Sequence, residues 1–251
     1  MIQLVSFRSG LNRRKRIEYT IDILNYATEP FVLFCGHTIF EKEDIIELKK
    51  RLTNRKVAAL VEVRHVISSG FIDNSNCLYL VQGGNVINLF TNQHFASSDE
   101  IQNDEDLAER FMLELEQRRR FEIDGIRYLV LQCGEINILS NIQSEANKVV
   151  FRFPNRPDLA ARFENLLAES DVILNPIHTP MGNQGKMHKR REYLSAQNRY
   201  YFSCCNTKPA DRKNNIPEGS LLNKLQYAYH NGEPMIPTDV EITDDFLIQS
   251  F

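Results

Sequence analysis

Short apolar runs alternate with amphipathic segments along the first quarter of the chain. The runs at 2–7, 31–34 and 57–63 have the length and composition of buried strands. Between them, residues 14–27 and 41–52 place apolar side chains at close to helical spacing. This strand-helix-strand-helix-strand order, with its short connections, predicts a mainly parallel sheet packed against helices.

The pattern changes in the next part of the chain, where predicted strands follow one another directly. Strands at 77–82 and 86–90 flank Gly83-Gly84-Asn85, which is typical of a hairpin turn. A second hairpin signal, Asp124-Gly125, separates two further strand-like runs. Strands joined by such tight turns are antiparallel, so we expect mixed sheets.

The second half of the chain alternates helices and strands again. Residues 97–106 are polar and acidic and indicate a loop, a turn is expected at Asn231-Gly232, and residues 233–251 form an acidic, partly apolar tail. The other predicted elements are helices at 107–115, 158–168 (capped by Asn155 or Asp158) and 186–198, and strands at 121–123, 127–132, 149–153, 171–175, 200–206 and 225–229. We expect a single α/β domain over residues 1–251.

Composition and charge restrict the class of protein. Hydrophobic residues make up 42% of the chain and charged residues 25%, as in an ordinary soluble globular protein. The net charge is -3, so the basic clusters at 13–16, 118–120 and 186–191 predict solvated surface rather than a nucleic-acid site. The sequence shows no signal-peptide pattern and no apolar run of the ~20 residues that a membrane-spanning helix needs. Five cysteines without C-x-x-C spacing argue against zinc and favour a reduced, cytoplasmic protein.

The strongest candidate for chemistry follows the apolar run at 128–131. Cys133, Gly134 and Glu135 come directly after this predicted strand, and open α/β sheets usually place their sites at strand ends. Gly134 allows a sharp turn, and Cys133 could act as a nucleophile, with the amide groups of the turn facing developing negative charge. The alternative is that Cys133 is a small, inert core residue.

Four segments of the sequence, taken in order, resemble those of a known family. They are Leu4-Val-Ser-Phe7 with the helix after it, Asn85 to Phe95, Gly125 to Glu135, and the group Asp171-Val-Ile-Leu-Asn-Pro176, Lys189-Arg-Arg-Glu-Tyr-Leu194 and Asn198 to Asn206. The third of these is similar to the nucleophile strand of the nitrilase, or carbon–nitrogen hydrolase, superfamily. The resemblance spans nearly the whole chain and is stronger in the order of segments than in any single motif.

This resemblance implies a four-layer α-β-β-α sandwich with mixed sheets. It also implies hydrolysis of amides or nitriles through a Glu-Lys-Cys triad, in which Cys133 falls on the nucleophile. The family's glutamate would follow the second strand, where this sequence has Phe34-Cys35-Gly36-His37, and His37 or Glu41 is the nearest titratable replacement. The family's lysine falls on Asn92, which donates hydrogen bonds but carries no charge.

One hypothesis is therefore a rebuilt hydrolase site. His178, at another strand end, or His37 could serve as the base for Cys133, and Lys186 or Lys189 could return a positive charge to the pocket. The candidate catalytic residues are Cys133, Glu135, His178 and His37, and the candidate substrate-binding residues are Asn92, His94, Gly134 and Lys186. A zinc site of His37, His94, His178 and Glu135 is the less favoured alternative, so we expect no metal and no cofactor.

The other hypothesis is that the fold is kept and the chemistry lost, which would leave a scaffold or a binding module. In either case the expected ligand is a small amide-like molecule, and neither a membrane nor a nucleic acid is an expected partner. The resemblance implies a homo-oligomer, and the basic helix could face an anionic substrate, a protein partner or solvent. Thiol reactivity separates the two hypotheses, because a working nucleophile alkylates quickly at neutral pH.

Overall fold

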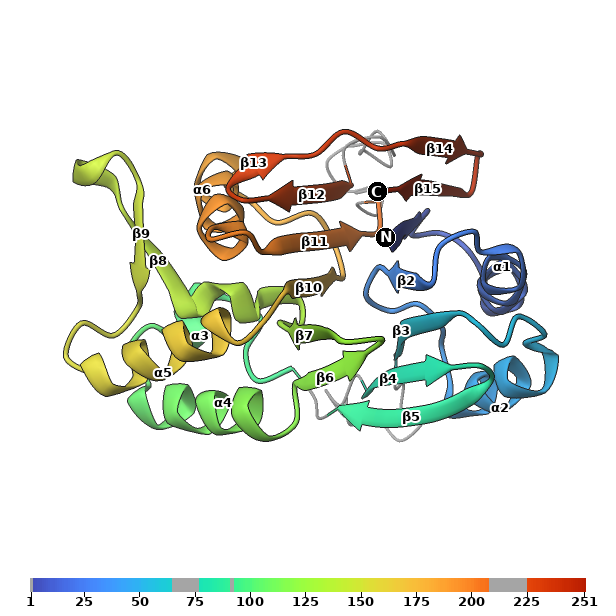
Figure 1. Cartoon of the computed structure of the whole chain (residues 1–251), viewed down its shortest axis with the longest axis horizontal. Helices are drawn as coiled ribbons and strands as arrows, with labels where there is room; N and C mark the ends of the chain where they lie inside the picture. Colours follow the sequence, from blue (N-terminus) through green and yellow to red (C-terminus); the bar gives the residue numbers. More distant parts are fainter. Residues whose placement is uncertain (1, 65–76, 91–92, 208–224) are drawn as a thin grey trace, which may run out of the picture.

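Two large β-sheets lie face to face in the computed structural model, which describes residues 2–64, 77–90, 93–207 and 225–251. Helices cover the outer side of each sheet, so the layers follow the order α-β-β-α (Figure 1). On one side lie α1 (Arg13–Tyr26) and α2 (Lys42–Arg51), and on the other lie α4 (Glu105–Gln117), α5 (Pro157–Ala168) and α6 (Gln184–Ser195). The predicted four-layer sandwich is confirmed.

Both sheets mix parallel and antiparallel strands, as the sequence predicted. The first sheet has the spatial order β14 (Asp239–Ile242), β15 (Phe246–Ser250), β1 (Ile2–Phe7), β2 (Phe31–Phe34), β3 (Ala58–Val63), β4 (Cys77–Gln82) and β5 (Asn85–Phe90). The second has the order β13 (Glu233–Pro234), β12 (Gln226–His230), β11 (Tyr200–Cys205), β10 (Val172–Ile177), β7 (Ile126–Val130) and β6 (Arg120–Ile123). The parallel strands are β1, β2 and β3 in the first sheet and β7, β10 and β11 in the second.

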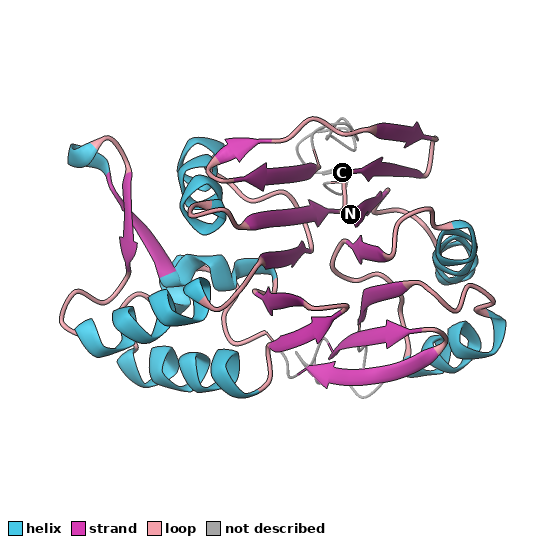
Figure 2. Cartoon of the chain, viewed as in Figure 1, coloured by secondary structure: helices cyan, strands magenta, loops and turns pink. Residues whose placement is uncertain are grey.

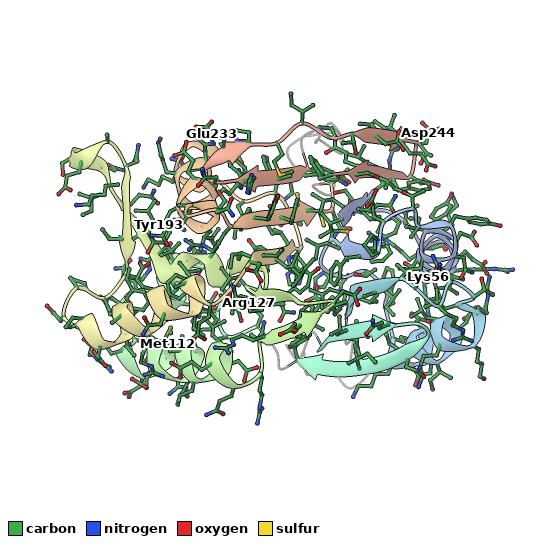
Figure 3. The ribbon with its side chains drawn as sticks, in the orientation of Figure 1. Lys56, Met112, Arg127, Tyr193, Glu233 and Asp244 are labelled. Atoms are coloured by element: carbon green, nitrogen blue, oxygen red, sulfur yellow. The ribbon has the colours of Figure 1, made fainter. Side chains whose placement is uncertain are left out.

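The parallel strands of the second sheet contain apolar runs because both faces are covered along those residues. Val130, Leu174 and Phe202 belong to the core between the two sheets. Leu129 and Ile173, next to them in sequence, pack under the helices on the opposite face. Figure 3 shows the side chains that fill the space between these layers. A strand buried on both faces shows no polar alternation, which is why the sequence contains continuous apolar runs.

The predicted hairpin turns are present. Gly83 and Gly84 have φ angles of +56° and +84°, and Asp124 and Gly125 have φ angles of +51° and +78°. Two consecutive residues with positive φ fit the twist of the flanking strands, and glycine and aspartate adopt that conformation at low cost. The structure thus confirms the turns that the sequence predicted at these two positions.

Two local predictions were wrong. Residues 97–106 are not a simple loop, because they contain α3 (Ser98–Ile101) and the start of α4. Ser97 and Asp104 cap these helices by accepting hydrogen bonds from the backbone N–H groups of Glu100 and Leu107. Neither Asn155 nor Asp158 caps α5, which instead begins at Pro157 after an Arg156 cap.

The C-terminal tail contributes strands to both sheets. β13 pairs with β12 at the edge of the second sheet, whereas β14 and β15 belong to the first. There β15 pairs antiparallel with β1, which lies at the opposite end of the chain. All four residues of β14 are exposed, so the alternating Val240 and Ile242 of this edge strand do not mark a buried face. No helix in the described part of the chain combines the length and apolar character needed to span a membrane.

A small hairpin extends away from the two sheets beside α5 (Figure 2). It consists of β8 (Leu139–Ile142) and β9 (Lys148–Phe151), joined through the short 3-10 helix η2 (Gln143–Glu145). It follows a second 3-10 helix, η1 (Cys133–Ile138), which begins at the candidate nucleophile. The hairpin and η1 together follow β7, the strand that precedes Cys133, and end at Phe151.

Candidate active site

Several candidate residues meet where parallel strands of the two sheets end. His37 follows β2, and Glu62 is the penultimate residue of β3, both in the first sheet. Cys133 follows β7 and His178 follows β10, both in the second sheet. A backbone hydrogen bond of 2.9 Å from the N–H of Gly36 to the carbonyl of Ile177 joins the two sheets here. The sandwich therefore brings together side chains from four strand ends.

His178 and Glu62 form the centre of this cluster. The Nε2 atom of His178 lies 2.9 Å from Oε1 and 2.8 Å from Oε2 of Glu62, whose residue exposure is only 1%. The backbone N–H of His37 donates to Glu62 Oε2 at 2.5 Å, and the Gln132 side-chain amide donates to Oε1. The His37 ring stacks on the His178 ring with 3.8 Å between centroids. Three donors thus hold the carboxylate, and a stacked ring holds the imidazole.

The electrostatics of the cluster favour a charged pair. Burial alone would lower the pKa of His178, but the charge of Glu62, a hydrogen bond with the Cys133 sulfur and the hydrogen bonds to Glu62 raise this pKa well above its usual value. Burial alone would raise the pKa of Glu62, but the charge and hydrogen bonds of His178 hold it well below its usual value. At neutral pH the pair is therefore an imidazolium and a carboxylate.

His37 behaves differently from His178. Burial, followed by the positive charge of His178, lowers the pKa of His37 to about 4. His37 is consequently neutral at physiological pH and covers one face of the charged His178 ring. Its backbone has a φ angle of +54°, a left-handed conformation that is unusual for a residue with a side chain.

Cys133 has the position and conformation of a presented nucleophile. Its φ angle is +44°, which is strained for a residue other than glycine. The side-chain amide of Asn175 holds this turn by donating to the carbonyls of Leu131 and Cys133, at 2.6 and 3.2 Å. Cys133 is half-buried and lines an open cleft, whereas the side chains of Cys35, Cys204 and Cys205 are buried.

Gly36 makes room for the pair. A Cβ atom at this position would lie 2.3 Å from Cδ2 of His178 and 2.8 Å from Oε2 of Glu62. Both distances are shorter than any real carbon contact, so only glycine fits without moving the pair. Gly36 stands in the segment after the second strand where the family's glutamate was expected, and the carboxylate is supplied by the neighbouring strand β3.

The cleft beside Cys133 has a volume of about 580 Å³ and a basic lining. Arg152, Lys186 and Arg190 contribute positive charge, and none of the described residues that line the cleft is acidic. Burial, followed by the charge of Arg152, lowers the pKa of Arg190 to about 10, and burial lowers the pKa of Arg152. Both guanidinium groups remain charged at neutral pH.

Glu135 lies apart from the cluster around His178. Its side chain is fully buried and pairs with the equally buried Arg119 at 3.2 Å. It also accepts hydrogen bonds from the backbone N–H groups of Gln132 and His94, at 2.6 and 2.9 Å. These contacts tie the turn after β7 to the segment that contains His94. The carboxylate does not line the cleft.

The other predicted residues have varied positions. A Cβ at Gly134 would lie 1.9 Å from the carbonyl oxygen of Ala96, so Gly134 allows close backbone packing. His94 is partly buried, with its ring 5.8 Å from that of Phe111. Lys186 lines the cleft. Asn92 lies outside the described residues.

Glu41 and Lys189 were the further candidates to replace the family's glutamate and lysine. Neither side chain lies in the cluster around His178. Glu41 caps α2 and pairs with Arg13 at 2.5 Å. Lys189 pairs with Glu192 at 2.7 Å on the surface of α6. Within the part of the chain that the structure describes, His37, Glu62 and His178 could hold a metal ion, since their ligand atoms lie within 4.8 Å of one another. A metal ion there would replace the proton that His178 shares with Glu62.

Sequence reasoning missed Glu62, Arg152 and Arg190. Glu62 had a detectable signal, because a single carboxylate interrupts an otherwise apolar run in Ala-Ala-Leu-Val-Glu-Val. Arg152 had the same kind of signal, because it interrupts the apolar run Val149-Val-Phe-Arg-Phe153, whereas Arg190 stands in a segment that already contains several other basic residues.

Comparison with known proteins supports the fold. The sequence matches no protein-family model, and no curated protein matches it significantly. A glutamine-dependent NAD+ synthetase from Acinetobacter baumannii has a TM-score of 0.57 and 13% identity, over 98% of this chain and 44% of that one. A nitrilase-superfamily amidase from Nesterenkonia AN1 has a TM-score of 0.55 and 12% identity, over 100% and 89%. A CN-hydrolase superfamily protein from Xanthomonas campestris has a TM-score of 0.51 and 11% identity, over 98% and 88%.

The chain therefore has the nitrilase, or CN-hydrolase, fold. It spans less than half of the length of the NAD+ synthetase. At these identities the similarity establishes the architecture, and any activity has to be argued from the site itself.

Proposed function

We propose that this protein cleaves the carbon–nitrogen bond of a small amide, with Cys133 as nucleophile, His178 as proton carrier and Glu62 as the carboxylate that orients and charges His178. The observation that carries this proposal is the buried carboxylate of Glu62 at 2.8 Å from the ring of His178, at the strand ends where the half-buried Cys133 also lies; the Cys133 sulfur is one of the groups that raise the pKa of His178. A nucleophile, a base and a group that orients the base are the parts that thiol catalysis requires.

Attack takes place beside the imidazolium of His178 and requires the sulfur of Cys133 to react as a thiolate. The sulfur of Cys133 forms a bond to the amide carbon, and the carbonyl oxygen takes up the negative charge of the tetrahedral intermediate. When the carbon–nitrogen bond breaks, the imidazolium of His178 gives its proton to the leaving amine. The product of this half-reaction is a thioester on Cys133 and a neutral His178, with Glu62 still ionised.

Hydrolysis of the thioester reverses these roles. The thioester carries no negative charge, so one of the influences that raise the pKa of His178 disappears. The neutral imidazole takes a proton from water, the resulting hydroxide attacks the thioester carbon, and the carbon–sulfur bond breaks. The acid leaves and the sulfur is again paired with an imidazolium. Glu62 holds the ring in one orientation throughout.

The replacement of the expected triad supports the same mechanism. In the nitrilase-like pattern a lysine would supply positive charge near the nucleophile, and this sequence has Asn92 at that position. The imidazolium of His178 supplies a positive charge beside the sulfur instead. A related structure also indicates the class of ligand, because the Nesterenkonia amidase has been solved with butyramide. That this chain forms a homo-oligomer and that it binds a protein partner remain predictions.

The test is the reactivity of Cys133 in the full chain. Iodoacetamide labelling at pH 7, followed by peptide mass spectrometry, should modify Cys133 faster than a free cysteine peptide and faster than the buried Cys204. His178→Gln should slow the labelling by roughly 10²-fold or more, because the group that stabilises the thiolate is removed. His188→Gln is the matched control, since His188 also pairs with a glutamate, at 2.9 Å, but on the surface of α6.

Turnover is tested with a panel of small amides and nitriles, with Cys133→Ala as the blank. Release of ammonia or amine by the wild type and not by Cys133→Ala supports the hydrolase. Labelling of Cys133 no faster than that of a free cysteine peptide, and unchanged by His178→Gln, would overturn the proposal in favour of a non-catalytic binding module.

A further inference from the structure

The basic cleft contains two neighbouring arginines, Arg152 and Arg190, that form no ion pair with a carboxylate of the described residues. Arg190 lies on α6 and has an exposure of only 6%. Its Nε donates to the side-chain oxygen of Asn141 and its Nη1 to that of Asn137, both at 2.8 Å. Nη2 has no hydrogen-bond partner among the described residues. These neutral partners orient the guanidinium but leave its charge uncompensated.

Arg152 follows β9 and faces the same cleft. Its Nε donates to the carbonyl of Asn137 at 2.5 Å and its Nη2 to the carbonyl of Leu139 at 3.2 Å. Within the described part of the chain Nη1 has no partner. The exposed Asp99 attracts Arg152 through space but forms no ion pair with it. Both arginines are therefore held by neutral groups. On each guanidinium group, one nitrogen forms no hydrogen bond with the described residues.

Asn137 connects this pair to the nucleophile. Its side-chain amide donates to the carbonyl of Gly134 at 2.8 Å, one residue after Cys133. Its side-chain oxygen accepts from Arg190, and its backbone carbonyl accepts from Arg152. The positions of the two guanidinium groups are thus fixed relative to the turn that presents the thiol.

Placing two like charges side by side in a partly buried site opposes folding unless an anion binds there. Other buried arginines show the usual solution, such as Arg119, which pairs with Glu114 and Glu135. Arg16, Arg191 and Arg199 also lack a carboxylate partner in the described residues, but they do not line the cleft. Among the arginines in the described part of the chain that lack a carboxylate partner and are at least half-buried, Arg152 and Arg190 are the two that line the cleft beside Cys133, together with Lys186.

We infer that Arg152 and Arg190 bind an anionic oxygen group, a carboxylate or a phosphate, on the molecule whose amide carbon Cys133 attacks. The preferred substrate is accordingly an amide that also carries a negative charge, and a neutral amide such as butyramide is a poor substrate. Guanidinium groups match the geometry of both anions through paired hydrogen bonds. This assignment of the substrate class rests on the proposed function of Cys133.

Protection of Cys133 from iodoacetamide tests this inference with simple anions in place of the substrate. Inorganic phosphate and succinate are the anionic probes, succinamide is the neutral analogue, and sodium chloride matched in ionic strength controls for screening. Phosphate or succinate should slow labelling, and succinamide and chloride should not. Which anion protects at the lower concentration distinguishes phosphate from carboxylate recognition.

Arg152→Gln and Arg190→Gln should each raise the concentration needed for half-protection by roughly tenfold or more, because a hydrogen bond to a charged group is lost. Arg190→Lys keeps the charge and should lose less. Arg120→Gln is the control, since Arg120 is exposed and already paired with Glu169 at 2.8 Å. Equal protection in all variants, or equal protection by sodium chloride, would overturn the inference.

Stability measurements separate this inference from the proposed function. Without added anion, Arg190→Gln should unfold at the same or a higher urea concentration than the wild type, whereas a purely structural arginine would give a lower midpoint. Phosphate or succinate should raise the midpoint of the wild type and raise it less in Arg152→Gln. If Cys133 proves unreactive but phosphate or succinate still stabilises the wild type more than Arg152→Gln, the catalytic proposal fails and the anion site stands.

Discussion

Gly36→Ala tests the geometry of the candidate site directly, because the added methyl group would enter the space of the His178–Glu62 pair. The new Cβ would lie 2.3 Å from His178 Cδ2, 2.8 Å from Glu62 Oε2 and 3.1 Å from the backbone nitrogen of His178. Gly36 has no positive φ angle, so the substitution introduces a steric conflict without a conformational one.

The size of the effect follows from these distances. Ordinary van der Waals contact begins at 3.4 Å, so the ring of His178 has to move by about 1 Å. A displacement of that size at a catalytic group lowers the rate by roughly 10²-fold. The accompanying loss of folding stability should be about 1–3 kcal/mol, as for other substitutions that overfill a packed interior.

The assay is the rate of iodoacetamide labelling at Cys133, together with urea unfolding of the same preparation. Gly10→Ala is the matched control, because a Cβ at Gly10 would meet no atom within 4 Å. We expect Gly10→Ala to resemble the wild type in both measurements. We expect Gly36→Ala to be folded but to label about as slowly as His178→Gln.

A folded Gly36→Ala protein that labels Cys133 within about threefold of the wild-type rate would refute this reasoning. It would show either that the pair can shift without consequence or that His178 does not activate the sulfur. The labelling rate of His178→Gln would separate these two cases, since slow labelling of that variant agrees with the first and labelling at the wild-type rate agrees with the second.

Three further predictions concern charged groups around the site. Glu62→Gln removes the largest influence that opposes the effect of burial on His178, so the pKa of His178 should fall. Labelling of Cys133 should then slow by roughly 10²-fold or more, and NMR titration of His178 and a pH–rate profile check this. His37 has a folded-state pKa of about 4, below its unfolded value of 6.5, so the free energy of unfolding of the wild type should fall by up to about 3 kcal/mol as the pH falls through this window. His37→Asn should lose less, which urea unfolding at pH 7 and at pH 4.5 measures. Glu135→Gln should lower the free energy of unfolding by about 3 kcal/mol, because the fully buried Arg119 loses a charged partner, and an unchanged urea midpoint would contradict the scaffold role of this carboxylate.

Much of the fold could be predicted from local patterns. The strands at 2–7 and 31–34 agree with the structure residue for residue, because both are fully buried and therefore rich in apolar residues. The turn at Asp124-Gly125 was equally clear, because it uses residue types that tolerate positive φ. The strands of the tail at 233–251 were missed because β14 is exposed and its sheet is completed by a strand from the other end of the chain.

The candidate site was only partly predictable. The sequence placed Cys133, His37 and His178 at strand ends, and the structure brings these three strand ends together. The sequence also predicted that Glu135 lies beside these three residues, because only Gly134 separates Glu135 from Cys133 in the chain. The tight turn of η1 directs that carboxylate to Arg119 under the sheet instead. Separation along the chain does not fix which face of a turn a side chain occupies.

The sequence by itself therefore determined most of the strands and helices, the turns and the position of a thiol after a buried strand, because these depend on periodicity and on conformational preference within a few residues. Only the tertiary structure decided that Glu62 is the partner of His178, 116 residues away, and that Arg152 and Arg190 share a cleft with Cys133. Those contacts depend on the order of strands in each sheet and on how the two sheets face each other. Neither property is encoded in the local alternation of apolar and polar residues.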